Sequence, residues 1–358
     1  MNNIIRCPEE LPLKRGDMWV FLAGPIQGAP DWQSSIEELP EIEGVTFLSP
    51  RRKNNPKGSE DSTNVFSDKD YAEQVEWETK GLRYCDLVLF WIPSPIEDIP
   101  GRAYAQTTRF ELGENLARGK NIILGVSEDI PGRRYFLRKA SDYNQGPVLP
   151  TLESCLKALE VIVKEKKDNP KVFFTADTHF GSKRTLEFSR RPFSSVEEMD
   201  EKMIENWNKI VSPWDTVYHL GDFGDTSALQ LLNGKKILVM GNYEEEEKNQ
   251  GEVSFIDYIL KGLEKGWSKV VQSPYIPDEE IISGYDIVLS HKPSAGQRFT
   301  NQDCYYLFGH IHRLQMIKKR GLCVSQDCHN FFPVSQDDVR FYLEAQKNGY
   351  YDDEVYSG

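Results

Sequence analysis

Short apolar runs alternate with helical patterns throughout the first half of the chain, and this alternation restricts that half to few folds. The apolar runs are WVFLAG, VTFLS, DLVLFWIP and NIILGV, and the stretches with helical periodicity are DWQSSIEEL, DYAEQVEWETKGLRY and TTRFELGENLARG. Near-continuous apolar strands separated by helices are typical of a parallel sheet covered on both faces. We therefore predict a doubly wound parallel sheet. The polar stretch RRKNNPKGSEDSTN is rich in turn formers and is predicted to be a mobile loop.

A change of pattern near residue 169 divides the chain into two parts. An amphipathic helix is predicted for TLESCLKALEVIVKEKK, followed by the polar stretch KKDNPK and the apolar strand VFFTAD. All six histidines come after residue 178, so the two parts differ in chemistry. A length of 358 residues fits two domains, each with its own core. We predict two α/β domains, residues 1–168 and 169–358.

Composition and charge exclude several classes of protein. No apolar run approaches the roughly 20 residues of a membrane helix, and the N-terminal stretch lacks the features of a secretory signal, so we expect a soluble, cytoplasmic protein. A net charge of −13 opposes the wrapping of duplex nucleic acid, because that affinity depends on Lys and Arg. The six cysteines show no CxxC spacing and are expected to be reduced and structural. Small anionic substrates remain compatible with this composition.

Five short signatures in the second half place metal-ligand side chains after apolar strands. They are Asp177-x-His179, Gly221-Asp222, Gly241-Asn242, His291 and Gly309-His310-x-His312. Oxygen and imidazole ligands suit Mn, Fe, Zn or Mg. Two such ions roughly 3.5 to 4 Å apart neutralise a phosphate and generate hydroxide near neutral pH. Any one motif also arises by chance, but five at strand ends indicate a two-metal phosphoesterase site.

This ordered set resembles the calcineurin-like metallophosphoesterases over nearly all of residues 171–350. The resemblance implies an α/β/β/α sandwich and two divalent metal ions. It also implies three groups of ligands: Asp177, His179 and His312 for one ion; Asn242, His291 and His310 for the other; and Asp222 as the bridge between them.

Tyr243 departs from that family, which usually has His after the Gly-Asn pair to contact the phosphate and help protonate the leaving group. A tyrosine with an ordinary pKa of about 10 donates hydrogen bonds but relays protons poorly at neutral pH. The substitution therefore favours a phosphodiester, or an ester with a good leaving group. The alternative is that Tyr243 merely packs.

The first half offers a second candidate site. The strand FLAGPIQG ends in a tight turn at Gly24 and Pro25, where ligands bind in doubly wound sheets. Two carboxylates, Glu78 and Glu111, are each expected at the functional end of a helix. Asp86 and Arg109 are further candidates for nucleotide binding. The alternatives are that Asp86 holds a neighbouring backbone segment and that Arg109 pairs with an acid.

Four segments of the first half, VFLAGPI, YAEQVEWE, CDLVLFWIP and TTRFELGE, resemble the nucleoside 2-deoxyribosyltransferase family and its nucleotide N-hydrolase relatives. The match runs from about residue 18 to 163, and it implies a Rossmann-like or flavodoxin-like domain. By this resemblance Glu111 is the nucleophile that attacks the anomeric carbon, and Glu78 handles the proton of the base. We expect the helix dipole to keep Glu111 ionised. The family often places Tyr where this chain has Phe21, and it often completes its sites in a homo-oligomer.

Three more polar residues have weaker assignments. His219 is expected to be a core or supporting histidine, Asp225 to orient a ligand or to be a surface carboxylate, and His329 has no partner motif.

The whole pattern predicts a bifunctional enzyme acting on small nucleosides or nucleotides, with one domain for N-glycosidic bonds and one for phosphoesters. The alternative makes the first domain a non-catalytic nucleotide or ADP-ribose binding module that serves a phosphodiesterase.

Overall fold

The chain divides into two compact units, Met1–Asn169 and Pro170–Gly358, in the computed structural model. The structure describes residues 2–11, 16–53, 68–101, 103–143, 146–299 and 304–350. Residues 54–64 of the predicted mobile loop lie outside the described residues. All six cysteines are free thiols, as expected. No helix within the described ranges is long and apolar enough to cross a membrane.

A parallel sheet forms the centre of the first unit, as the sequence predicts. Its strand order within the described residues is β1-β3-β2-β4-β5, and each neighbouring pair is parallel. The apolar runs form β2 to β5, whereas β1 was not predicted. The strands are β1 (Asn3–Arg6), β2 (Met18–Ala23), β3 (Val45–Ser49), β4 (Leu87–Ile92) and β5 (Ile122–Val126).

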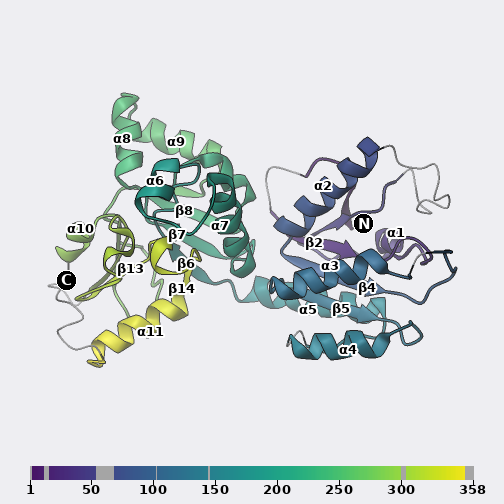
Figure 1. The fold of residues 1–358 in the computed structure, drawn as a ribbon. Helices are drawn as coiled ribbons and strands as arrows, with labels where there is room; N and C mark the ends of the chain where they lie inside the picture. The colour runs from purple at the N-terminus through teal and green to yellow at the C-terminus, as the bar shows by residue number, and fades with distance from the viewer. Residues whose placement is uncertain are drawn as a thin grey trace. The chain divides into compact units, whose positions relative to one another are not determined.

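Helices cover both faces of this sheet (Figure 1). Leu124 and Val126 of β5 share a core with residues of α2, α3 and α4, whereas Gly125 faces the other way and lies against Cys155 of α5. Successive residues of a strand point to opposite faces, so α5 covers the second face. The helices are α1 (Trp32–Ser35), the 3₁₀ helix η1 (Ile36–Glu38), α2 (Asp68–Tyr84), α3 (Gln106–Ala117), α4 (Arg133–Asp142) and α5 (Leu152–Asp168).

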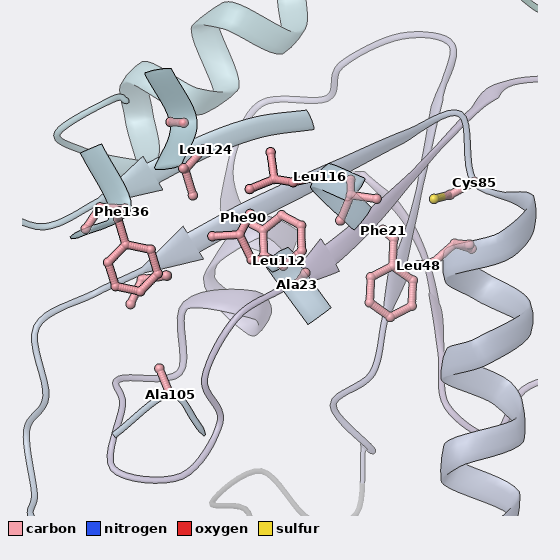
Figure 2. Packing of buried hydrophobic residues seen from close by; sticks show 14 of the residues in the cluster. Phe21, Ala23, Leu48, Cys85, Phe90, Ala105, Leu112, Leu116, Leu124 and Phe136 are labelled. Atoms are coloured by element: carbon pink, nitrogen blue, oxygen red, sulfur yellow. The ribbon is translucent and has the colours of Figure 1, made fainter. Parts of the chain in front are cut away.

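The core of the first unit fixes α2 and α3 against the sheet. Figure 2 shows Phe90 of β4 beside Leu112 and Leu116 of α3, and Phe21 of β2 close to Leu48 of β3. All five side chains are almost fully buried, and burying each contributes roughly 1.5 to 3 kcal/mol. The two helices that carry the predicted carboxylates are therefore held by extensive apolar contact.

The strand order reverses at β2, which has β3 on one side and β4 on the other. In doubly wound sheets such a reversal opens a crevice at the carboxyl ends of the strands. The chain leaves β2 at Gly24, where a Cβ atom would lie 2.3 Å from the carbonyl oxygen of Trp91. Only glycine fits that turn without displacing the end of β4.

Two sheets form the described part of the second unit. One has the order β14-β6-β7-β8-β9, with β14 antiparallel to β6; the other has the order β10-β11-β13-β12, with β12 antiparallel to β13. Apolar residues of both sheets share one core cluster. The strands are β6 (Val172–Thr175), β7 (Thr216–His219), β8 (Lys235–Val239), β9 (Lys269–Val271), β10 (Ile287–Ser290), β11 (Tyr305–Phe308), β12 (Ile317–Lys318), β13 (Gly321–Cys323) and β14 (Val334–Ser335).

Helices of the second unit flank these sheets (Figure 1). Helix α7 begins after Ser195, whose side chain accepts a hydrogen bond from the backbone N–H of Glu198. The helices are α6 (Lys183–Phe188), α7 (Val196–Ile210), the 3₁₀ helix η2 (Thr226–Leu231), α8 (Asn242–Gln250), α9 (Phe255–Lys265), α10 (Pro293–Gln297), the 3₁₀ helices η4 (His312–Leu314) and η5 (Gln326–Cys328), and α11 (Gln336–Lys347).

Candidate functional sites

The predicted ligand residues of the second unit lie just beyond the carboxyl ends of strands. Asp177 follows β6, Asp222 follows β7, Asn242 begins α8 after β8, His291 directly follows β10, and His310 follows β11. Parallel strands present their carboxyl ends at one edge of a sheet, and loops at that edge carry functional side chains. The strand pattern therefore brings together residues that are more than 130 positions apart in the chain.

The backbone at this edge adopts an unusual conformation. Five of the predicted ligand residues have positive φ angles, a region that residues other than glycine rarely adopt. Such residues cost free energy and gather at functional sites, where the surrounding fold holds them in place. The residues are Asp177 (φ 56°), His179 (49°), Asp222 (57°), His310 (73°) and His312 (49°).

The side chains of these residues form two candidate metal-binding clusters. In each cluster the ligand atoms all lie within 4.8 Å of one another. The first cluster is Asp177, His179 and His312; the second is Asp222, His291 and His310.

Asp222 also reaches towards the first cluster, because its Oδ2 lies 3.7 Å from Nε2 of His179 while its Oδ1 lies 3.5 Å from Nε2 of His291. Asn242 joins the second cluster through Oδ1, which lies 2.9 Å from Nε2 of His291. The seven predicted ligands are therefore adjacent in space.

One unpaired nitrogen and a group of closely spaced polar atoms in these clusters fit cations. Nε2 of His179 is buried and has no hydrogen-bond partner within the described ranges, which is rare for a buried polar atom. Burial lowers the pKa of His179 to about 3, so its imidazole is neutral, the form that binds metals. Three lone-pair atoms, Oδ1 of Asn242, Oδ1 of Asp222 and Nδ1 of His310, converge on Nε2 of His291. Oxygen and imidazole donors of this kind suit Mn, Fe, Zn or Mg.

His291 and His312 are oriented by bonds to their other ring nitrogen. Nδ1 of His291 donates to the carbonyl oxygen of Leu220 at 2.7 Å, and Nδ1 of His312 lies 2.7 Å from Oδ2 of Asp327. Such bonds fix the ring and aim Nε2 at a metal position. Burial acts to lower the pKa of His291, but Asp222 and Asp177 outweigh it and raise the pKa to about 9.

Asp327 and Arg191 form a buried support that the sequence analysis missed. The guanidinium of Arg191 lies 2.9 Å from Oδ2 of Asp327 and donates at 2.7 Å to the carbonyl oxygen of Thr178. Burial acts against the charge of Asp327, but His312 and Arg191 hold its pKa far below the ordinary range. Neither residue stands in a recognisable motif, so only tertiary structure reveals the pair.

Glu244 is a second support that the sequence analysis missed. Its carboxylate accepts from the backbone N–H groups of Asp222 at 2.9 Å, Phe223 at 2.9 Å and Gly241 at 2.8 Å. Glu244 therefore joins the turns after β7 and β8 and fixes Asp222. The sequence could have indicated this role, because Glu244 is the third residue of α8 and a carboxylate at that position reaches back to the start of its helix.

Tyr243 lies beside the clusters. Its backbone N–H donates to Oδ1 of Asp222 at 3.0 Å, and its ring packs edge-on against His179 with centroids 4.9 Å apart. Its hydroxyl accepts a hydrogen bond of 2.8 Å from Nη1 of Arg184 in α6. The side chain is 37% exposed, so a ligand at the clusters can reach it.

The remaining polar candidates of the second unit are supporting residues. His219 is fully buried, and its Nε2 lies 3.0 Å from the hydroxyl of Thr178. Asp225 begins η2, where its side chain accepts from the backbone N–H of Ser227 at 2.9 Å. Nε2 of His329 lies 2.7 Å from the carbonyl oxygen of Cys323. None of the three belongs to either candidate cluster.

A cavity of about 520 Å³ lies at the strand reversal of the first unit. Its lining includes Gly24 and Pro25 after β2, Arg52 after β3, Glu78 of α2 and Glu111 of α3. The volume is within the usual range for small-molecule sites, which is about 300 to 1,000 Å³. Four of the predicted residues therefore share one pocket, and both carboxylates face it.

The two carboxylates differ from the sequence prediction in their positions on the helices, and Glu111 also differs in its protonation. Glu78 lies in the middle of α2, and Glu111 lies beyond the first turn of α3, so neither occupies the end of its helix. Burial, with Glu78 and Glu114 nearby, raises the pKa of Glu111 to about 7. The expectation that the helix dipole keeps Glu111 ionised is therefore wrong, because that effect fades after the first turn. Burial also raises the pKa of Glu78.

A polar network that the sequence analysis missed supports Glu78. Nε2 of Gln74 donates to Oε1 of Glu78 at 2.7 Å, and Oε1 of Gln74 accepts from Nε of Arg52 at 2.9 Å. The charge of Arg52 and the bond from Gln74 favour the ionised form of Glu78 and partly offset its burial. Arg51 and Arg52 follow β3 after Pro50, and this position near a strand end was the only indication of their role in the sequence.

Asp86 and Arg109 do not line the cavity. Oδ2 of Asp86 accepts from the backbone N–H of Trp19 at 2.7 Å, at the start of β4 and away from its carboxyl end. Arg109 stacks over the ring of Phe136 at 4.8 Å and donates to the carbonyl oxygen of Pro131 at 2.9 Å. The contact of Asp86 with the backbone of Trp19 agrees with the alternative role given for Asp86, and nucleotide binding by Asp86 and Arg109 stays a prediction.

Phe21 lines the cavity but is itself buried by α2. Its exposed fraction is 1%, and its ring centroid lies 6.1 Å from that of Trp77. A Cβ atom added at Gly81 would come within 2.8 Å of the Phe21 ring. The phenyl ring therefore provides apolar contact and offers no hydroxyl to either carboxylate.

Comparison with known proteins assigns part of the first unit. The family model "Nucleoside 2-deoxyribosyltransferase like" matches residues 17–130, so the first unit contains a domain of that kind. An uncharacterized protein of Methanocaldococcus jannaschii is 28% identical over 192 residues, 49% of this chain and 93% of its own length. The gene 66 protein of Mycobacterium phage L5 is 36% identical over 81 residues, 20% of this chain and 39% of its own length.

A solved structure was also found, a protein of unknown function from Aquifex aeolicus. It is 21% identical, and the match covers 49% of this chain and all of that one, with a TM-score of 0.36. This score is too low to assign a fold.

Proposed function

We propose that the chain is a bifunctional nucleotide-processing enzyme whose second unit is a two-metal phosphoesterase of the calcineurin-like type. The observation that carries the second activity is the pair of candidate clusters with Asp222 between them. This proposal includes an α/β/β/α sandwich for residues 169–358 and a deoxyribosyltransferase-like domain for residues 1–168.

The residues of the second unit have distinct roles in this proposal. Asp177, His179 and His312 would hold one divalent ion, Asn242, His291 and His310 the other, and Asp222 would bridge them. When bound, such ions neutralise phosphate oxygens and supply an activated water for attack. Asp327 orients His312, and Glu244 fixes the backbone of Asp222. The Tyr243 hydroxyl supplies a hydrogen bond but little proton transfer, so diesters and good leaving groups are favoured.

The first unit is proposed to cleave or exchange an N-glycosidic bond. One carboxylate of the pair attacks the anomeric carbon as the bond to the base breaks, and the other carboxyl gives its proton to the departing base. Water or a second base then takes the sugar from the carboxylate. By the family resemblance Glu111 is the nucleophile. Two carboxyls with raised pKa values in one cavity support a pair in which one carboxyl is protonated while the other is ionised.

Incubation of the protein with nucleosides and nucleotides, with and without acceptor bases, tests the first activity through chromatography of free base. We expect base release or exchange, and its loss in Glu111→Ala. In Glu78→Gln, reactions with poor leaving-group bases should slow more than those with good ones.

Persistent absence of free base alongside nucleotide binding would favour the binding module instead, an alternative that Phe21 supports. Release of nitrophenolate from aryl phosphodiesters in the presence of Mn²⁺ tests the second activity independently. Failure of every added divalent ion to support that release would refute it.

A further inference from the structure

Helix α6 lies at the edge of the two candidate clusters and carries residues that neither cluster uses. Its C-terminal neighbour Ser189 places a hydroxyl 3.4 Å from Nδ1 of His312. Arg184, in the first turn of α6, reaches Tyr243 through the 2.8 Å hydrogen bond to its hydroxyl. One short helix therefore contacts the surroundings of both His179 and His312.

Arg184 connects two aromatic rings. Its guanidinium lies 5.3 Å from the ring centroid of Phe188, one turn along α6, while its Nη1 holds the hydroxyl of Tyr243. Tyr243 in turn packs against His179. A continuous series of flat groups therefore leads outward from the first cluster, and we call Arg184, Phe188 and Tyr243 the α6 platform.

Phe188 is 79% exposed. A single exposed aromatic ring is ordinary on a protein surface. Phe188 differs because a cation fixed by Tyr243 holds it beside a candidate catalytic centre. Flat aromatic and guanidinium groups beside a phosphate site are what nucleic-acid and nucleotide binders use to stack bases.

We propose that the α6 platform binds the nucleoside part of the phosphoester that the second unit hydrolyses. This inference rests on the proposed phosphoesterase and names its substrate class. The base stacks on Phe188, and the guanidinium of Arg184 lies along the sugar-phosphate. The Tyr243 oxygen already accepts from Arg184, so its own proton is available to a substrate oxygen.

Two esters with the same leaving group test this proposal: thymidine 5′-(p-nitrophenyl phosphate) and methyl p-nitrophenyl phosphate. Both release nitrophenolate, so the ratio of their kcat/KM values isolates the contribution of the nucleoside. We expect the native ratio to exceed ten and to fall about tenfold in Phe188→Ala, the usual size of one lost stacking contact. Phe188→Tyr retains a ring and should retain the ratio, and Arg184→Gln should lower it.

Phe341→Ala provides the matched control, because Phe341 is a 62% exposed phenylalanine on α11 of the same unit. It should leave the ratio and the activity unchanged. A native ratio near one, or an unchanged ratio in Phe188→Ala, would overturn the platform while leaving the phosphoesterase intact.

Absence of hydrolysis of both esters would instead refute the phosphoesterase. The platform is then judged by hydrogen–deuterium exchange of residues 183–190 with thymidine 5′-monophosphate and Mn²⁺. Protection in the native chain that is lost in Phe188→Ala is expected, and no protection in the native chain would overturn the platform.

Discussion

Glu111→Gln should stabilise the first unit at alkaline pH, even though it removes a proposed catalytic group. The fold raises the pKa of Glu111 from 4.5 to about 7, so the ionised form is disfavoured in the native state by roughly 3 kcal/mol. Partial exposure of Glu111 and its coupling to Glu78 reduce this penalty. We therefore expect Glu111→Gln to stabilise the first unit by about 2 kcal/mol at alkaline pH. Because the folded pKa lies above the unfolded one, the native chain loses this stability as pH rises from about 4.5 to about 7.

Urea unfolding at pH 4.5, 6 and 8, followed by hydrogen exchange in the β4 peptide, reports the stability of the first unit alone. The gain of Glu111→Gln over the native chain should be near zero at pH 4.5 and reach its full value at pH 8. Glu76→Gln is the control, because Glu76 is exposed on α2 and pairs with Lys80 at 2.7 Å. It should change stability by less than about 0.5 kcal/mol. A gain in Glu111→Gln that does not grow with pH refutes the reasoning.

Three further predictions concern the second unit. Asp222→Asn should remove bound metal and phosphoesterase activity but leave the circular dichroism spectrum unchanged; full metal content measured by mass spectrometry would contradict this. Tyr243→His should raise turnover of nucleoside monophosphates, since it restores a proton relay, and phosphate release measures it. Equal native activity on monoesters and diesters would count against that role. Glu244→Gln should weaken metal affinity about 10- to 100-fold by loosening the turn that holds Asp222, as measured by titration against a competing chelator.

The elements with long or strongly apolar patterns were predictable from sequence. The strands from β2 to β6 and the helices α2, α3 and α5 follow the expected periodicity. Strands β1, β12 and β14 were missed because none contains three consecutive apolar residues, and their pairing with distant strands defines them. Helices α8 and α9 were missed as well. The acid-rich α8 resembles a solvated loop, and its Glu244 is buried only because two turns enclose it.

The residues of the candidate sites could be predicted from sequence where they come shortly after an apolar strand. Asp222 and His291 could be found because a short apolar run precedes each. Asp327 and Arg191 could not, since each gains its role from a partner far away in the chain. Arg109 is two positions from Glu111 on α3, and sequence proximity did not show that this spacing directs the two side chains to different faces of the helix.

The positive φ angles of five proposed ligand residues also affect which substitutions relatives of this chain would accumulate. Each costs on the order of 1 kcal/mol or more in a residue other than glycine. A lineage that no longer needed the metal chemistry would gain stability by accepting glycine at Asp177, Asp222 or His310. Glycine at these positions would therefore mark a descendant without the proposed metal site, whereas Asp and His there would indicate that this site is kept despite its cost in stability.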